Sequence, residues 1–133
     1  MLAMTDTPIE SFLPVFASTG IPVAFLVPTP TGFGKSIMDA IAPVRNLLKD
    51  AGLHDYEEQK QGPANKVLVE SYFVHADHVV GTQTSLYRPQ TKQGDPRIWF
   101  YALNKYCDPC NLLALVVIER KIYIFKDKFK NLY

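Results

Sequence analysis

Alternating and continuous apolar positions divide most of this chain into short extended segments. An apolar run over 23–27 follows the break Gly20-Ile21-Pro22 and predicts a strand. The patterns over 67–74, 79–87 and 112–118 predict three more strands, and 121–125 is expected to pair back on 112–118 across a tight turn at Glu119-Arg120. The pattern therefore indicates a mixed fold, mainly β with short α-helices.

Three segments are predicted to be helical. Residues 9–17 are expected to form a short helix despite Pro14, and an S-x-x-D start at Ser36 predicts a second helix that ends at Gly52 and is kinked or divided by Pro43. The apolar residues of this second helix recur at helical spacing, at Ile37, Ile41, Val44, Leu47 and Leu48. The aromatic segment 98–106 is predicted to form the third helix, with Trp99 anchored in the core.

Composition restricts the class of protein. The chain has 133 residues, of which 47% are hydrophobic, a size that suits one compact core. Its apolar runs are shorter than the roughly 18 residues that cross a bilayer, and its acidic start lacks the basic residues of a secretory signal, so we expect a soluble cytoplasmic protein without membrane partners. A net charge of only +1 argues against general, nonspecific coating of nucleic acid.

The most informative stretch is the polar run over 85–97. Its two prolines and one glycine interrupt regular structure. Cations are supplied by Arg88, Lys92 and Arg97, and neutral donors and acceptors by Gln90, Thr91 and Gln93. Arginine can pair bidentately with guanine, glutamine with adenine, and lysine can hold phosphate, so this run has the chemistry of an arm that contacts DNA.

Three phrases of the sequence carry a resemblance to a known family: PTPTGFGKSIMDAIAPVRNLL, AGLHDYEEQKQGPANKVLVESYFV and SLYRPQTKQGDPRIWFYALNKY. Over residues 20–126 the chain resembles the N-terminal recognition domain of some type II restriction endonucleases, which is similar to the EcoRII effector-binding domain and precedes a nuclease domain of the MvaI/BcnI type. The resemblance implies a DNA-binding pseudobarrel that grips DNA between two protruding arms, flanked here by an N-terminal extension at 1–19 and a tail at 127–133.

The resemblance also implies a function and a set of contacts. The domain would bind a short specific sequence of double-stranded DNA, of the CC-x-GG type, and would assist a separate nuclease domain or subunit. It would have no catalytic residues, metal or cofactor, because magnesium would belong to the nuclease. The first arm (28–36), the polar segment after Gly52 and the second arm (85–97) would supply the DNA contacts: Thr29, Thr31, Lys35, Ser36, His54, Gln59, Gln61, Lys66, Arg88, Gln90, Lys92, Asp95 and Arg97.

Two enzymatic alternatives remain open. The segment Pro30–Ser36, PTGFGKS, imitates a phosphate-binding loop between a strand and a helix. Thr29, however, stands where the consensus has a small residue, and no strand ends in the acidic pair that would position magnesium. Glu119 and Lys121 form an E-x-K triplet typical of magnesium-dependent nucleases, with Asp95 or Asp108 as an upstream acid. Because the triplet coincides with a predicted turn, its charges are also expected from solvation alone.

The cysteines and histidines give weaker signals. Cys107 and Cys110 form a C-x-x-C pair after a predicted helix, whereas a redox pair needs its first cysteine at a helix N-terminus. His75 and His78 lack the spacing that would complete a zinc site with this pair. We therefore expect the cysteines to be structural and the two histidines to lie at the surface.

Overall fold

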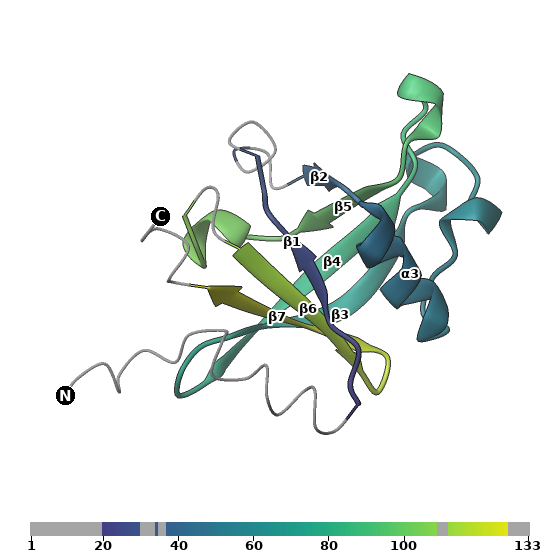
Figure 1. Ribbon diagram of the computed structural model, residues 1–133. Helices are drawn as coiled ribbons and strands as arrows, with labels where there is room; N and C mark the ends of the chain where they lie inside the picture. Colours follow the sequence, from purple (N-terminus) through teal and green to yellow (C-terminus); the bar gives the residue numbers. More distant parts are fainter. Residues whose placement is uncertain (1–19, 30–33, 35–36, 109–111, 128–133) are drawn as a thin grey trace.

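The computed structural model describes residues 20–29, 34, 37–108 and 112–127 (Figure 1). Its strands are β1 (Ala24–Leu26), β2 (Ile37–Asp39), β3 (Val67–Val74), β4 (Val79–Tyr87), β5 (Arg97–Phe100), β6 (Leu112–Ile118) and β7 (Lys121–Asp127). Its helices are α3 (Ala42–Asp50) and the 3-10 turns η3 (Tyr56–Glu58), η4 (Pro63–Asn65), η5 (Lys92–Gly94) and η6 (Leu103–Lys105). The predicted helix at 9–17 and the residues Thr31, Lys35 and Ser36 lie outside the described residues.

The strands form one curled half-barrel sheet in the order β1-β6-β7-β3-β4-β5-β2. Among the described strands, neighbours pair antiparallel except β3 and β7, which are parallel. The strands β1 and β2 are consecutive in the chain yet lie at opposite edges of the sheet. The helix α3 follows β2 after two residues and packs on β1 and β6, so it bridges the two edges of the curled sheet (Figure 1).

The core lies inside the curl. Side chains that are fully buried there come from distant parts of the chain and include Val44, Leu48, Leu86, Ile98, Phe100, Leu113, Leu115, Ile122 and Ile124. The apolar face of α3 contributes Val44, Leu47 and Leu48 to it. Burying one such aliphatic or aromatic side chain contributes about 1.5–3 kcal/mol, which is why the alternating strands close on this helix.

Most of the predicted strands are confirmed. The segments β3, β4 and β6 coincide with their predicted ranges, and β1 lies within 23–27. The predicted turn between β6 and β7 is also confirmed, because Glu119 and Arg120 both have positive φ (52° and 65°), as a two-residue type I′ hairpin requires. Over the residues that the structure describes, the fold is mainly β with the α-helix α3, which agrees with the class that the sequence pattern predicts.

The predicted helix over 36–52 is wrong in its first half. Residues 37–39 form the edge strand β2, paired with β5, and α3 begins at Ala42. Pro43 lies in the first turn of α3, where its missing N–H costs nothing, so it starts the helix instead of kinking it.

The predicted helix over 98–106 is also wrong. Arg97–Phe100 is strand β5 and only Leu103–Lys105 forms a 3-10 turn. Ile98 and Phe100 are fully buried, whereas Arg97 and Trp99 alternate with them on the opposite face. The expectation that Trp99 is anchored in the core is therefore incorrect: its ring is half-buried on the outer face of the sheet.

Candidate nucleic-acid interface

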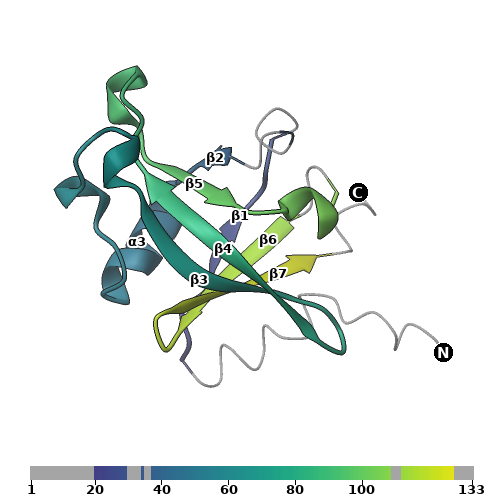
Figure 2. The ribbon, with the colours of Figure 1, turned by 180° about the vertical axis from the view of Figure 1, so that it is seen from behind.

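One end of the sheet carries two adjoining protrusions, which are seen from both sides in Figures 1 and 2. We call residues 88–96, between β4 and β5, the arm, and residues 54–66, before β3, the brace. The backbone N–H of Gly62 in the brace donates to the carbonyl oxygen of Arg88 (2.8 Å), and the side-chain amide of Gln61 donates to that of Pro89 (3.2 Å). The brace thus fixes the start of the arm.

The side chain of Arg88 turns inward and ties the arm to the brace. Its Nε donates to the carbonyl oxygen of Gly94 (2.8 Å), and its Nη1 donates to those of Gln59 (3.1 Å) and Tyr56 (3.4 Å). One guanidinium therefore closes the arm on itself and joins it to η3. A fork of several fixed donors is the feature that distinguishes arginine from lysine for this task.

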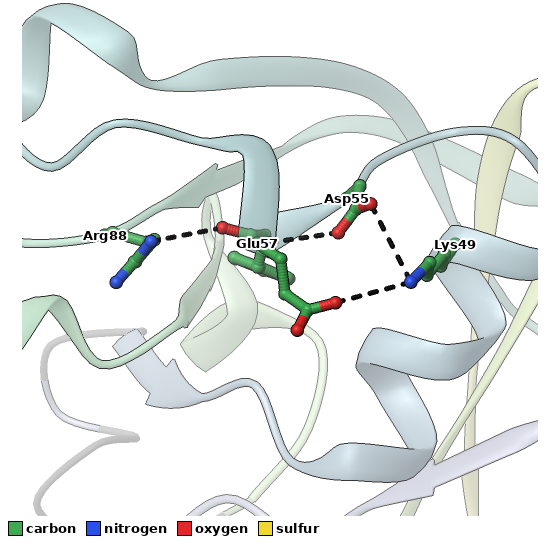
Figure 3. A network of polar contacts seen from close by, with 5 residues as sticks. Lys49, Asp55, Glu57 and Arg88 are labelled. Atoms are coloured by element: carbon green, nitrogen blue, oxygen red, sulfur yellow. Dashed lines mark hydrogen bonds and ion pairs between the residues drawn. The ribbon is translucent and has the colours of Figure 1, made fainter.

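The turn η3 is itself held on three sides. Lys49 of α3 lies near the carboxylates of Glu57 (3.3 Å) and Asp55 (3.8 Å), as Figure 3 shows, with Arg88 on the opposite side of the turn. The Asp55 carboxylate also caps η3 by accepting from the Glu57 N–H (3.0 Å), and the Tyr56 hydroxyl donates to the carbonyl oxygen of Arg97 (2.8 Å). The brace is thus connected to the helix, to β5 and to the arm.

Gln59 is the buried polar centre of the brace. Its Nε2 donates to the carbonyl oxygens of Asn65 and Leu86, both at 2.9 Å. Its Oε1 must then accept, so Nε2 of His54, 3.0 Å away, carries the proton. With 9% of its surface exposed, Gln59 joins the brace to β4 from within.

His54 makes the stability of the brace dependent on pH. Burial lowers the pKa of His54 below its usual 6.5, although the hydrogen bond to Gln59 partly opposes this shift. The unfolded chain therefore binds a proton at His54 more readily than the folded protein, and stability is lost as the pH falls from 6.5 through the lower folded pKa. Urea unfolding at pH 7.5 and at pH 5.5 should show this loss.

The control for this prediction is His54→Gln, whose amide can still donate to Gln59 but does not titrate. We expect the difference in unfolding free energy between the two pH values to shrink in this variant. An unchanged difference would mean that other groups cause the acid sensitivity.

Between the arm and the start of β3, the outer face of the sheet presents a cation over two aromatic rings. The Nζ of Lys66 lies 5.3 Å from the ring centre of Tyr87 and 5.8 Å from that of Trp99. Lys66 is exposed, and both rings are half-buried. Ile37, the first residue of β2, pairs with Trp99 at the same place.

Two glycines allow the arm and the brace to approach each other closely. Gly62 and Gly94 both have positive φ, 109° and 71°. A Cβ on Gly62 would lie 2.4 Å from Oε1 of Gln90, and a Cβ on Gly94 would lie 2.5 Å from Cγ of Gln61. Neither position accommodates another residue without displacing these glutamines.

The residues expected to contact DNA fall into two groups. Thr29, Gln61, Lys66, Gln90 and Asp95 are exposed, and all but Thr29 lie on the arm or the brace. Arg88, Gln59 and His54 instead direct their polar atoms to internal partners. Arg97, with 18% of its side chain exposed, forms an ion pair with Asp39 and so links β5 to β2. Lys92 lies in η5, at the tip of the arm.

Sequence reasoning missed the outward direction of Tyr87 and Trp99. The alternation of Arg97-Ile98-Trp99-Phe100 could have indicated this direction, because it has the two-residue period of a strand with one buried face. The segment 98–106 was instead predicted to be a helix, although its aromatic residues favour a strand. The register Tyr87 to Arg97 and Ser85 to Trp99 then places Tyr87 and Trp99 on the same face of neighbouring strands.

The enzymatic alternatives gain no support from the geometry. Strand β2 begins at Ile37, directly after the PTGFGKS segment, where a phosphate-binding loop would lead into a helix N-terminus. Glu119 lies in the exposed tip of the β6–β7 hairpin, and Asp95 lies in the arm before β5. Within the described ranges, no three His, Cys, Asp or Glu side chains are grouped so that they could hold a metal ion.

Cys107 has the character of a structural residue. Its thiol is free and buried, and burial raises its pKa to about 12. A thiol of this kind is protonated at neutral pH and is a poor nucleophile. Cys110, the other cysteine of the pair, lies outside the described residues.

Comparison with known proteins adds no family assignment. No family model, curated protein or solved structure matches this chain. Among the described residues, no helix has the length and apolar character needed to cross a membrane.

Proposed function

We propose that this chain binds a short specific sequence of double-stranded DNA through the arm and the adjoining outer face of the sheet, as the recognition module of a restriction endonuclease. The observation that supports this most directly is the protruding arm, whose backbone is fixed by Arg88 and the brace. Side chains able to read base edges, those of Gln90, Thr91, Gln93 and Asp95, are exposed on it. A rigid loop of this kind presents donors and acceptors without a large entropic cost.

The outer face beside the arm fits the less specific part of such an interface. Lys66 supplies an exposed cation that could contact a phosphate. The rings of Trp99 and Tyr87 position the ammonium group of Lys66 by cation–π contacts. Thr29, Thr31, Lys35 and Ser36 of the first arm would add further contacts to the duplex. Ile37, the next residue of the chain, pairs with Trp99.

The charge of the site predicts how binding depends on salt. The arm and brace carry carboxylates at Asp55, Glu57, Glu58 and Asp95 as well as cations. Only phosphate contacts release counterions, so the salt dependence of the binding constant should correspond to about one to three phosphate contacts. That dependence is much shallower than the one expected for a basic DNA-coating protein. Specificity would then come from directional hydrogen bonds.

Selection of bound duplexes from a randomised DNA pool tests this function, in about 150 mM salt and with a chelator that suppresses cleavage. We expect a short enriched motif.

Gln90→Ala and Asp95→Ala should each relax the preference at one position of the motif and cost about 1–3 kcal/mol of specific binding. Lys66→Ala should weaken binding to all sequences alike.

The matched control for Lys66→Ala is Lys105→Ala, which removes an exposed lysine from η6, at the opposite end of β5 from the arm. It should leave both affinity and motif unchanged. A pool without any enriched motif would contradict sequence-specific binding. Equal losses in the two lysine variants would remove the outer face beside the arm from the interface.

A further inference from the structure

The outer face of β3 and β4 contains a hollow. This groove of about 440 Å³ is lined by Glu70 and Tyr72 of β3, by Gly81, Thr82 and Gln83 of β4, and by Tyr101. It exists because Gly81 is the direct partner of Tyr72 and offers no side chain to cover the ring. A Cβ at Gly81 would lie 3.9 Å from Cε1 of Tyr72, an ordinary contact distance.

The ring of Tyr72 and the backbone of Tyr101 are held in position in this groove. Tyr72 stacks on Tyr123 with ring centres 5.2 Å apart, and its hydroxyl donates to Oε2 of Glu70. Tyr101 follows the end of β5, yet its N–H donates to the carbonyl oxygen of Gln83 (3.0 Å) and its own carbonyl accepts from the Thr82 hydroxyl (2.6 Å). Tyr101 is nevertheless 61% exposed, so its anchored backbone carries an accessible ring, which stands at 89° to the ring of Trp99.

The groove also has a carboxylate with one oxygen available. Oε2 of Glu70 accepts from Tyr72 and lies 3.9 Å from Nζ of Lys121. Among the described residues, no donor reaches Oε1. A carboxylate beside aromatic faces attracts a cation and repels a phosphate. The groove adjoins the proposed DNA surface, because the rings of Tyr101 and Trp99 lie 6.2 Å apart. It differs from that surface in charge, since its charged group is the carboxylate of Glu70 and not a cation.

We propose that this groove binds an arginine side chain of a partner polypeptide. A planar guanidinium can stack on the exposed ring of Tyr101 while it donates to Oε1 of Glu70 and to the amide oxygen of Gln83. Lysine fits less well, because its ammonium neither stacks nor donates in a plane. The partner contact is additional to DNA binding and does not depend on it.

Titration of the ¹⁵N-labelled full chain with N-acetyl-arginine methylamide tests this site, with N-acetyl-glutamine methylamide as the neutral control. We expect the arginine derivative to shift the amide signals of Glu70, Tyr72, Gly81, Gln83 and Tyr101, with a millimolar Kd, and the glutamine derivative to leave them unchanged. Glu70→Gln should weaken binding about fivefold or more, because the ion pair is lost. Lys121→Met should tighten it, because a competing cation is removed.

The variant Gly81→Val tests the groove by filling it, without changing any charged residue. Valine suits a strand, and its Cβ would lie at an ordinary contact distance from Tyr72. We therefore expect the melting temperature to be retained while the side chain fills the hollow and abolishes the arginine-induced shifts. The same variant should select the same DNA motif as the parent chain. Unaltered arginine-induced shifts in Gly81→Val, or equal shifts from the glutamine derivative, would overturn the proposal. Stronger shifts with a single-stranded oligothymidylate would also overturn it and assign the groove to unpaired bases.

Discussion

Alanine in place of Arg88 is expected to lower the free energy of unfolding by about 2–4 kcal/mol and to release the arm from the brace. The guanidinium donates to three backbone carbonyl oxygens, those of Gly94, Gln59 and Tyr56. A hydrogen bond from a charged donor contributes up to about 1.5–3 kcal/mol. Because Arg88 is only partly buried and its bond to Tyr56 is long (3.4 Å), we expect the total to lie below the sum of three such bonds. Urea unfolding measures the total, and amide exchange at Gly62 and Gly94 reports on the arm.

The control is Arg120→Ala, which removes an exposed arginine with a single backbone hydrogen bond, to Gly52 (3.2 Å). It should change the unfolding free energy by less than about 1 kcal/mol. Arg88→Lys should behave like the alanine variant, because one ammonium group cannot reach three carbonyls in different directions. A loss below about 1 kcal/mol in Arg88→Ala, with amide protection retained, would show that the arm is held by other contacts.

Gln59→Leu is expected to lower the unfolding free energy by about 3–5 kcal/mol. Leucine has a similar volume, so the change isolates the amide group. It leaves the carbonyl oxygens of Asn65 and Leu86 and the ring N–H of His54 without their partner in a water-poor part of the brace. Each unsatisfied buried group costs about 1–3 kcal/mol. Chemical unfolding at pH 7.5, where His54 is neutral, measures the loss.

Gln61→Leu provides the comparison, since it replaces the same residue type two positions away. Gln61 is exposed and makes one hydrogen bond to the arm, so we expect a loss of less than about 1 kcal/mol. Similar losses in the two variants would contradict the placement of Gln59 as the buried polar centre of the brace.

These two predictions change the interpretation of the polar residues around the arm. From composition, Arg88 and Gln59 are as suitable for base contacts as Gln90 or Asp95. In the structure their donors are already used to hold the arm and brace together. In the proposed function, then, loss of Arg88 would reduce DNA recognition through the shape of the arm, whereas loss of Gln90 would remove a direct reading contact.

The strands that were predicted correctly can each be recognised from a contiguous segment of the sequence. β3, β4, β6 and β7 are long enough for an apolar run or an alternation to be visible, and β6 and β7 are joined by a turn whose two residues permit a hairpin. The turn chemistry and the burial pattern act within one contiguous segment. No distant contact is needed to recognise them.

The short strands β2 and β5 were predicted as helix because their pairing is not local. β2 pairs with β5 across about sixty residues of chain, and β5 is held between β2 and β4. Over so few residues, Ile37 and Ile41 match a helical period by coincidence, and tertiary pairing overrides the propensity of the segment.

The amino-acid sequence alone determined that this is a mainly β chain with an exposed polar arm, because strand alternation, proline, glycine and charge act over a few neighbouring residues. Only the tertiary structure decided which polar side chains are available on that arm. The carbonyl oxygens that engage Gln59 and Arg88 include partners 27 to 32 residues away, and those partners exist only once the brace has packed against β4 and the arm. Burial and hydrogen-bond satisfaction are properties of the assembled fold, so they direct Arg88 and Gln59 inward and leave Gln90, Asp95 and Lys66 at the surface.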